Sequence, residues 1–231
     1  MELCHKSPTR KFSIAVDVAM NYTGTADSFE REWRKIKHGV LLQGFPEYVA
    51  LEGRAAEIRL FEVGVIPGLL QTREYAEALA RGAVDRGVIT PEQADQHVSL
   101  LMERQGALLR TVPPMLIAVL DESCIRRPIG SPAVMDAQLQ HLADFATQSH
   151  TMLQIAPYSI GEQRPFNRAV NLLTLQDRSV VSYVESETQG HLDRELSSVI
   201  PMVRSYHQLQ AVSLSQTDTV DMIHQHRKGT P

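Results

Sequence analysis

The sequence predicts an α+β domain in which a mixed sheet of four or five strands is covered by helices. Two runs of apolar residues, 115–120 and 150–156, are typical of buried strands, and the apolar and β-branched residues at 58–66 predict a short strand or an extended arm. The segments between them have apolar residues at helical spacing. Two further runs, 169–175 and 180–185, are separated by a short polar turn, which predicts an antiparallel hairpin.

Composition limits the classes of function. The chain has 231 residues, 43% of them hydrophobic, and a formal net charge of −4. A protein that binds nucleic acid is expected to present a basic face, so we predict no direct contact with nucleic acid. No apolar run approaches the length of a membrane span, and residues 1–10 lack a signal-like apolar core. We therefore expect a cytoplasmic protein without membrane contact.

The residues that usually hold metals or cofactors are not arranged to do so. Cys4 and Cys124 have no zinc-type or disulfide spacing, and His224 and His226 would diverge on a helix. There is no phosphate-binding glycine loop. We expect no metal and no cofactor. Cys124, which follows a buried strand, is interpreted as a small apolar residue in preference to a nucleophile.

The chain divides into a helical element over residues 1–44 and an α/β domain over residues 45–231. In the first part, helical spacing predicts helices at about 13–20 and 25–38, with Trp33 packed inward. The basic cluster at 34–38 is interpreted as a solvated helix face, because Glu30 can pair with Arg34. At the start of the second part, Glu52 lies on or beside an apolar helical stripe. It either pairs with an arginine or points into a cavity.

A hinge at residues 65–76 is the least generic stretch. Pro67 and Gly68 force a turn, and Thr72 is suited to cap the following helix. The corner is either a packed connection or one side of a binding site. Beyond it, a helix should run from Pro91 to about Arg110 and bury Val98, Leu101, Leu108 and Leu109. Residues 157–166 have the length of a ligand loop, and 192–214 and 217–225 should be helical.

The sequence also carries a family resemblance. It rests on Tyr48-x-x-Leu51-Glu52-x-x-Ala55 and on Ile66-Pro-Gly-Leu-Leu-Gln-Thr72-x-x-Tyr75-Ala76, followed in order by Arg104-Gln105, Leu120-Asp-Glu122, Arg126-Arg127 and Tyr183-Val-Glu185. These runs resemble the C-terminal domain of actinobacterial helix-turn-helix regulators of the XRE type, a domain catalogued as one of unknown function and described as antitoxin-like. The resemblance covers about residues 12–227. Residues 6–37 resemble only the tail of the DNA-binding domain that such regulators carry, and the recognition helix has no counterpart.

This resemblance implies a stand-alone, regulator-derived domain that binds a small molecule, such as a specialised metabolite, or a protein partner, and not DNA directly. The expected pocket lies between the hinge, the helix with Arg104 and the strand with Tyr183. Its expected ligand-binding residues are Tyr48, Glu52, Leu69, Gln71, Tyr75, Arg104, Gln105, Arg126, Phe166, Tyr183 and Glu185.

Two other readings remain open. A helical face over 192–214 would suit a homodimer or a small protein partner. Alternatively, the domain is a repurposed cofactor-independent enzyme of the cyclase, isomerase or lyase type, in which Glu52, Glu122 or Glu185 transfers a proton.

Overall fold

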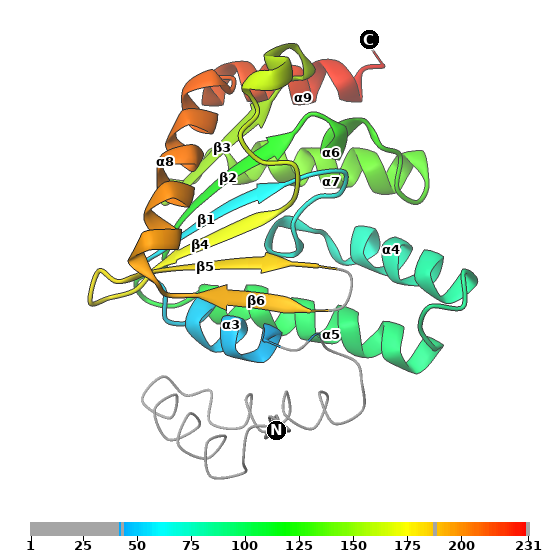
Figure 1. Ribbon diagram of the computed structural model, residues 1–231. Helices are drawn as coiled ribbons and strands as arrows, with labels where there is room; N and C mark the ends of the chain where they lie inside the picture. The colour runs from blue at the N-terminus through cyan, green and yellow to red at the C-terminus, as the bar shows by residue number, and fades with distance from the viewer. Residues whose placement is uncertain (1–41, 43, 187–188, 230–231) are drawn as a thin grey trace.

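A six-stranded mixed sheet in the order β3-β2-β1-β4-β5-β6 forms the centre of the protein (Figure 1). The computed structural model describes residues 42, 44–186 and 189–229. The strands are β1 (Glu57–Glu62), β2 (Met115–Asp121), β3 (Thr151–Ala156), β4 (Val170–Thr174), β5 (Val180–Glu185) and β6 (Gly190–Asp193). β1, β2 and β3 are parallel, whereas β4, β5 and β6 continue the sheet from β1 as antiparallel neighbours. The predicted α+β class and mixed sheet are confirmed.

The sheet has one strand more than the upper prediction. The extra strand is β6, which lies in the segment that helical spacing had assigned to a helix from Leu192. Residues 190–193 pair with the free edge of β5 instead. The helix then begins only at Leu196, after the Asp193 carboxylate has accepted a hydrogen bond from the Glu195 amide at 2.8 Å. Cross-strand pairing, which is not visible in local spacing, decided this boundary.

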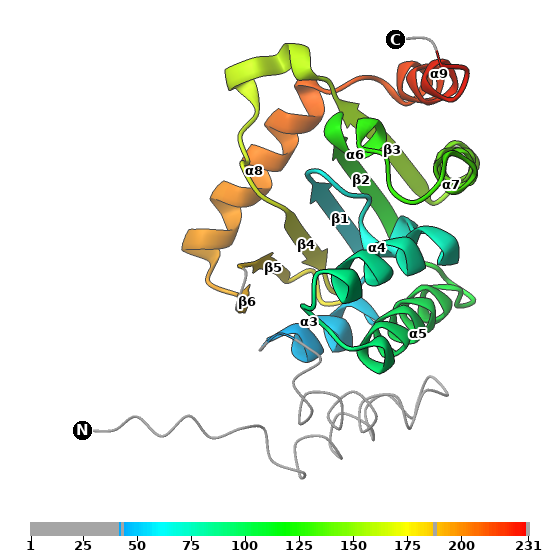
Figure 2. The same ribbon diagram turned by 90° about the vertical axis from the view of Figure 1, so that its right-hand side faces the viewer.

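Helices cover both faces of the sheet. They are α3 (Phe45–Glu52), α4 (Arg73–Asp85), α5 (Pro91–Leu108), α6 (Ser123–Arg126), α7 (Pro132–Phe145), α8 (Leu196–Val212) and α9 (Gln216–Arg227), with the 3₁₀ turns η2 (Gly68–Leu70) and η3 (Tyr158–Gln163). Figure 2 shows α8 on one face, and α3, α4, α5 and α7 on the other. Within the described residues, no helix is long and apolar enough to cross a bilayer.

The alternation of side chains along β1 divides the core in two. Ile58 and Leu60 point to the face covered by α3 and α7, while Phe61 points to the face covered by α8. Tyr206 of α8 is fully buried there, and its hydroxyl donates to the Leu60 carbonyl at 3.0 Å. One face of β1 therefore packs in the core layer under α3 and α7, and the other face packs in the layer under α8.

Local capping chemistry places the helix starts. Thr72 accepts from the Tyr75 amide, Thr90 forms a capping box with Gln93, and Ser131 accepts from the Val134 amide. These predicted starts are confirmed. The predicted burial of Leu109 is wrong, because α5 ends at Leu108 and Leu109 is 86% exposed.

The predicted helical element over residues 1–44, with its helices at 13–20 and 25–38, lies outside the described residues, apart from Leu42 and Gly44. Trp33, Cys4 and the basic cluster at 34–38 lie outside them as well.

Candidate functional site

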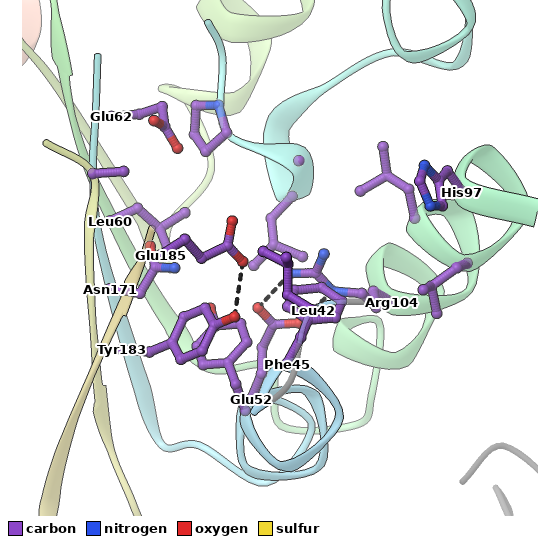
Figure 3. Close-up of a pocket in the computed structure, with 17 residues that line it drawn as sticks. Leu42, Phe45, Glu52, Leu60, Glu62, His97, Arg104, Asn171, Tyr183 and Glu185 are labelled. Carbon is purple, nitrogen blue, oxygen red and sulfur yellow. Dashed lines mark hydrogen bonds and ion pairs between the residues drawn. The ribbon is translucent and has the colours of Figure 1, made fainter. Parts of the chain in front are cut away.

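A cavity of about 350 Å³ lies between the sheet and the helices α3 and α5, at the end of β1 (Figure 3). Its walls come from segments far apart in the sequence. They consist of Leu42, Phe45, Tyr48, Glu52, Leu60, Glu62, Pro67, Gly68, Leu69, His97, Leu100, Leu101, Arg104, Ala169, Asn171, Tyr183 and Glu185. Mostly apolar walls with a few polar groups are typical of small-molecule sites, and the volume lies at the lower end of their range.

The position of the cavity follows from the sheet topology. β1 connects through α4 and α5 to β2 on one side, whereas its other neighbour is the later strand β4. In open α/β sheets, the carboxyl end of a strand at which the order reverses leaves a crevice that ligands occupy. Leu60 and Glu62 at the end of β1 line the cavity at such a point.

An aromatic cluster forms one wall. Tyr48 of α3 stacks on Tyr183 of β5 with ring centroids 4.3 Å apart, and Phe45 lies 6.0 Å from the first ring and 6.2 Å from the second. Gly190 lets β6 approach this cluster, because a Cβ atom there would lie 2.1 Å from the Tyr183 hydroxyl. The cluster therefore needs glycine at position 190.

A buried ion pair joins α3 to α5 at the base of the cavity. Arg104 Nε and Nη2 donate to the two carboxylate oxygens of Glu52, each at 2.9 Å. The Glu52 side chain is 2% exposed and that of Arg104 is 14% exposed. Burial lowers the pKa of Arg104, but the Glu52 charge and hydrogen bonds raise it, with a net rise that keeps the guanidinium charged. The Arg104 guanidinium also lies 4.9 Å from the centre of the Phe45 ring.

One end of the Arg104 guanidinium remains available. Within the described residues, Nη1 makes no hydrogen bond, in contrast to Nε and Nη2 (Figure 3). The cavity thus contains an N–H donor that can bind an acceptor atom of a ligand.

Two further carboxylates border the cavity from the sheet. Glu62 ends β1 and Glu185 ends β5 (Figure 3). Glu62 accepts a hydrogen bond from the Val63 amide at 3.2 Å, and Glu185 accepts one from the Tyr183 hydroxyl at 2.9 Å. Burial raises the pKa of Glu62 to about 7, and the nearby Glu185 charge adds to this rise. Glu62 is therefore poised between its neutral and ionised forms at physiological pH.

A comparison with protein-family models identifies the family of this domain. The model described as "Domain of unknown function (DUF5753)" matches residues 45–225. The chain belongs to this family. No curated protein and no solved structure matches the chain significantly.

The DUF5753 domain brings six of the eleven predicted ligand-binding residues to the cavity: Tyr48, Glu52, Leu69, Arg104, Tyr183 and Glu185. They come from α3, η2, α5 and β5. For Glu52 the two interpretations left open by the sequence hold together, because the carboxylate pairs with Arg104 and also lines the cavity.

Three of the predicted residues, Gln71, Tyr75 and Gln105, do not line this cavity but fix the hinge. The Gln71 side chain donates to the Ile66 carbonyl at 2.7 Å, and the Tyr75 hydroxyl accepts from the Ile66 amide at 3.3 Å. Gln105 donates to the carbonyls of Gly68 and Gln71. Their polar atoms satisfy backbone groups of the turn.

The hinge also depends on Gln138 of α7, a fully buried residue that the sequence did not single out as a hinge contact. Its side-chain nitrogen donates to the Leu70 carbonyl and its oxygen accepts from the Thr72 amide, both at 2.7 Å. The hinge is therefore a packed connection, and its residues Pro67, Gly68 and Leu69 also line the cavity, so the two interpretations do not exclude each other.

Arg126, Phe166 and Glu122 also lie away from the cavity. Arg126 pairs with Glu122, whose other oxygen accepts from the Tyr158 amide at 2.7 Å and so anchors η3. Phe166 packs 5.7 Å from Phe61 on the sheet face covered by α8. The alternation of β1 places Phe61, and with it Phe166, in the layer opposite the cavity.

Sequence reasoning missed several cavity residues: Phe45, Glu62, His97 and Asn171. A signal for Glu62 was available. Ile58 and Leu60 are buried on the cavity face, so the period-2 rule places Glu62 on the same face. Extending the strand by one step would have identified it.

Cys124 is buried and poorly suited to act as a nucleophile. Cys124 is fully buried, its thiol donates to the Glu62 carbonyl at 3.3 Å, and burial raises its pKa, so the reactive thiolate is disfavoured. In the part of the chain that the structure describes, no three His, Cys, Asp or Glu side chains are grouped to hold a metal.

Proposed function

We propose that this DUF5753 domain binds a small molecule in the cavity between α3, α5 and the sheet. The proposal rests on two polar atoms of the cavity that lack hydrogen-bond partners. Arg104 Nη1 and one oxygen of Glu62 have no hydrogen-bond partner within the described residues, although Nε and Nη2 of the same arginine and the other Glu62 oxygen are paired. Polar atoms left unpaired at a partly buried surface cost stability, and a ligand that pairs them recovers it.

The resemblance to XRE-type regulators supports an effector role. The hinge motif from Ile66 to Tyr75 forms the wall behind Leu69, and α5 supplies Arg104. A ligand that contacts both α5 and the sheet would favour one arrangement of α5, the hinge and the sheet. In a regulator, that change of conformation can alter binding to a DNA-binding domain or a protein partner. On this proposal the domain is a metabolite sensor derived from, or acting within, that class of regulator.

Ligand capture tests the proposal. The full-length protein is incubated with a small-molecule extract of its host, passed through a desalting column and denatured, and the released compounds are identified by mass spectrometry. Ala169→Trp fills the cavity, whereas Ala107→Trp places the same side chain on the exposed side of α5. We expect a compound that the wild type and Ala107→Trp retain and Ala169→Trp loses. Equal retention by all three proteins, or by none, contradicts the proposal.

Glu62 favours a second candidate function, which is cofactor-independent catalysis. A carboxyl group with a pKa of about 7 is suited to move a proton to or from a bound molecule at neutral pH, and Arg104 Nη1 can polarise a carbonyl group. Glu62 is better placed for this role than Glu122, which lies outside the cavity. In the same extract, an enzyme would convert a compound over repeated turnovers, and Glu62→Gln would lower the rate of conversion far more than it lowers retention of the compound. Capture without conversion contradicts catalysis and leaves the sensor role.

A further inference from the structure

We propose that the ligand of this cavity is a small organic cation, with a protonated amine held between Glu62 and Glu185 and an apolar body against the α3 and α5 walls. This inference rests on the proposed small-molecule function and specifies the chemistry of the ligand.

The charges of the lining have a surplus of carboxylates. Arg104 and Glu52 neutralise each other in a two-point ion pair. Glu62 and Glu185 then remain without a cationic partner among the described residues, since the hydrogen bonds that they accept come from a backbone amide and a tyrosine hydroxyl. A ligand cation at this position would complement the negative potential of both groups.

The acceptor geometry suits an ammonium group, which carries three N–H donors. Glu62 projects from β1 and Glu185 from β5. Asn171 belongs to β4, the strand between these two, and lies one residue pair back along the sheet, beside Leu60 and Tyr183 (Figure 3). Within the described residues, the Asn171 side chain makes no hydrogen bond, so its carbonyl oxygen can supply the third acceptor. Two carboxylates and one amide are thus presented from the same side of the cavity.

The rest of the lining fits an apolar body. The wall opposite the carboxylates consists of Leu42, Phe45, Leu69, Leu100 and Leu101. Arg104 Nη1 lies on this side and can bind a carbonyl or hydroxyl oxygen of the ligand. The volume of about 350 Å³ limits the ligand to one or two rings or an equivalent chain.

Amine binding should be linked to pH through Glu62. The ionisable groups around its carboxyl group are Glu185 and Tyr183 of β5, Glu52 of α3, Tyr75 of α4, Arg104 and His97 of α5, and Cys124 of α6. An amine cation attracts the ionised form of Glu62, and the ionised fraction rises steeply between pH 6 and pH 8 for a pKa of about 7. The apparent affinity should therefore rise roughly tenfold over this interval, in proportion to the competent fraction.

Titration calorimetry of the full-length protein with three compounds of similar shape tests the proposal. They are phenethylamine, phenethyl alcohol and hydrocinnamate, which are cationic, neutral and anionic at pH 8. We expect phenethylamine to bind at least tenfold more tightly than the alcohol, and hydrocinnamate to bind more weakly than both. Glu62→Gln and Glu185→Gln should each remove most of the preference for the amine, and Glu62→Gln should abolish the rise with pH. Glu103→Gln, an equal charge change on the exposed side of α5, should leave the preference intact.

Equal binding of the amine and the alcohol, or tighter binding of hydrocinnamate, overturns the amine assignment while the small-molecule function stands. An amine preference that persists in both Glu62→Gln and Glu185→Gln also overturns it, because the cation would then bind elsewhere. Absence of binding by all three compounds overturns the amine assignment as well. The capture experiment with Ala169→Trp decides the broader function independently of these titrations.

Discussion

The hinge corner (residues 66–75 with Gln105 and Gln138) and the neighbouring cavity both contain polar side chains packed against η2, but their hydrogen bonds differ. In the corner, the side-chain amides of Gln71, Gln105 and Gln138 all bond to backbone atoms of the turn. In the cavity, Arg104 Nη1 and one Glu62 oxygen have no such partner within the described residues.

This difference shows how a regulator-like motif can be mistaken for a ligand site. The hinge motif is specific because a Pro-Gly turn exposes backbone groups that only particular side chains can satisfy at these positions. In the cavity beside it, the Glu62 carboxylate is held without a cationic partner among the described residues, and burial raises its pKa. Substitutions should therefore destabilise the corner, but should relieve the cavity at Glu62.

The largest expected effect breaks the pair at the base of the cavity. Arg104→Met leaves the buried Glu52 carboxylate without its partner, which typically costs about 3–5 kcal/mol. Chemical denaturation at pH 7 measures the loss. The double variant Glu52→Leu with Arg104→Met should recover most of it, since both charges are then gone. A loss below about 1 kcal/mol for the single variant contradicts the structural weight given to this pair.

The next largest effect is a gain in stability, expected when the Glu62 carboxyl group is removed. The pKa of Glu62 is raised from 4.5 to about 7 in the folded protein, so the folded state binds the proton more tightly. Protonated Glu62 therefore contributes fully to the free energy of unfolding below about pH 4.5. This contribution falls as the pH rises through about 7, by about 3 kcal/mol in total.

Glu62→Gln should remove this loss, so the variant should be more stable than the wild type at pH 8 and similar to it at pH 4.5. Denaturation curves across this range measure both values, with Glu103→Gln as the control for the change of charge. If Glu62→Gln destabilises the protein at pH 8, the carboxylate has a stabilising partner and the contrast with the corner fails.

A smaller loss is expected in the corner. Gln138→Leu removes the partners of the Leu70 carbonyl and the Thr72 amide in a buried place, which costs about 2 kcal/mol or more. Gln148→Leu, on an exposed side chain after α7, should change stability by less than about 0.5 kcal/mol. If the corner is purely structural, the folded Gln138→Leu protein should keep its affinity for phenethylamine. A large loss of affinity at unchanged fold would extend the site into the corner.

The smallest expected effect concerns the cap of α4. Thr72→Ala removes the acceptor for the Tyr75 amide, and loss of such a cap typically costs about 1 kcal/mol. Thermal unfolding measures it. Thr72→Ser keeps the hydroxyl oxygen and should stay within a few tenths of a kcal/mol of the wild type. Equal losses in both variants would show that the methyl group, and not the hydrogen bond, matters here.

The sequence by itself determined the elements whose signals are local. Thr72, Thr90 and Ser131 cap helices as predicted, because capping needs only a side-chain oxygen and an amide three residues later. The runs at 115–120 and 150–156 also gave two of the parallel strands, because their burial leaves a local apolar signal, which is nearly continuous in β2.

Tertiary structure decided the rest. β6 exists because the edge of β5 was free to pair, and the face on which Glu62 lies becomes a cavity because α3, α5, β4 and β5 contribute walls around the end of β1. The same holds for the glutamines of the hinge. Nothing local distinguishes Gln138, which bonds to a turn 68 residues earlier in the chain, from a solvated glutamine. Whether a polar side chain completes a turn or faces a ligand depends on partners that only the folded chain brings within hydrogen-bonding distance.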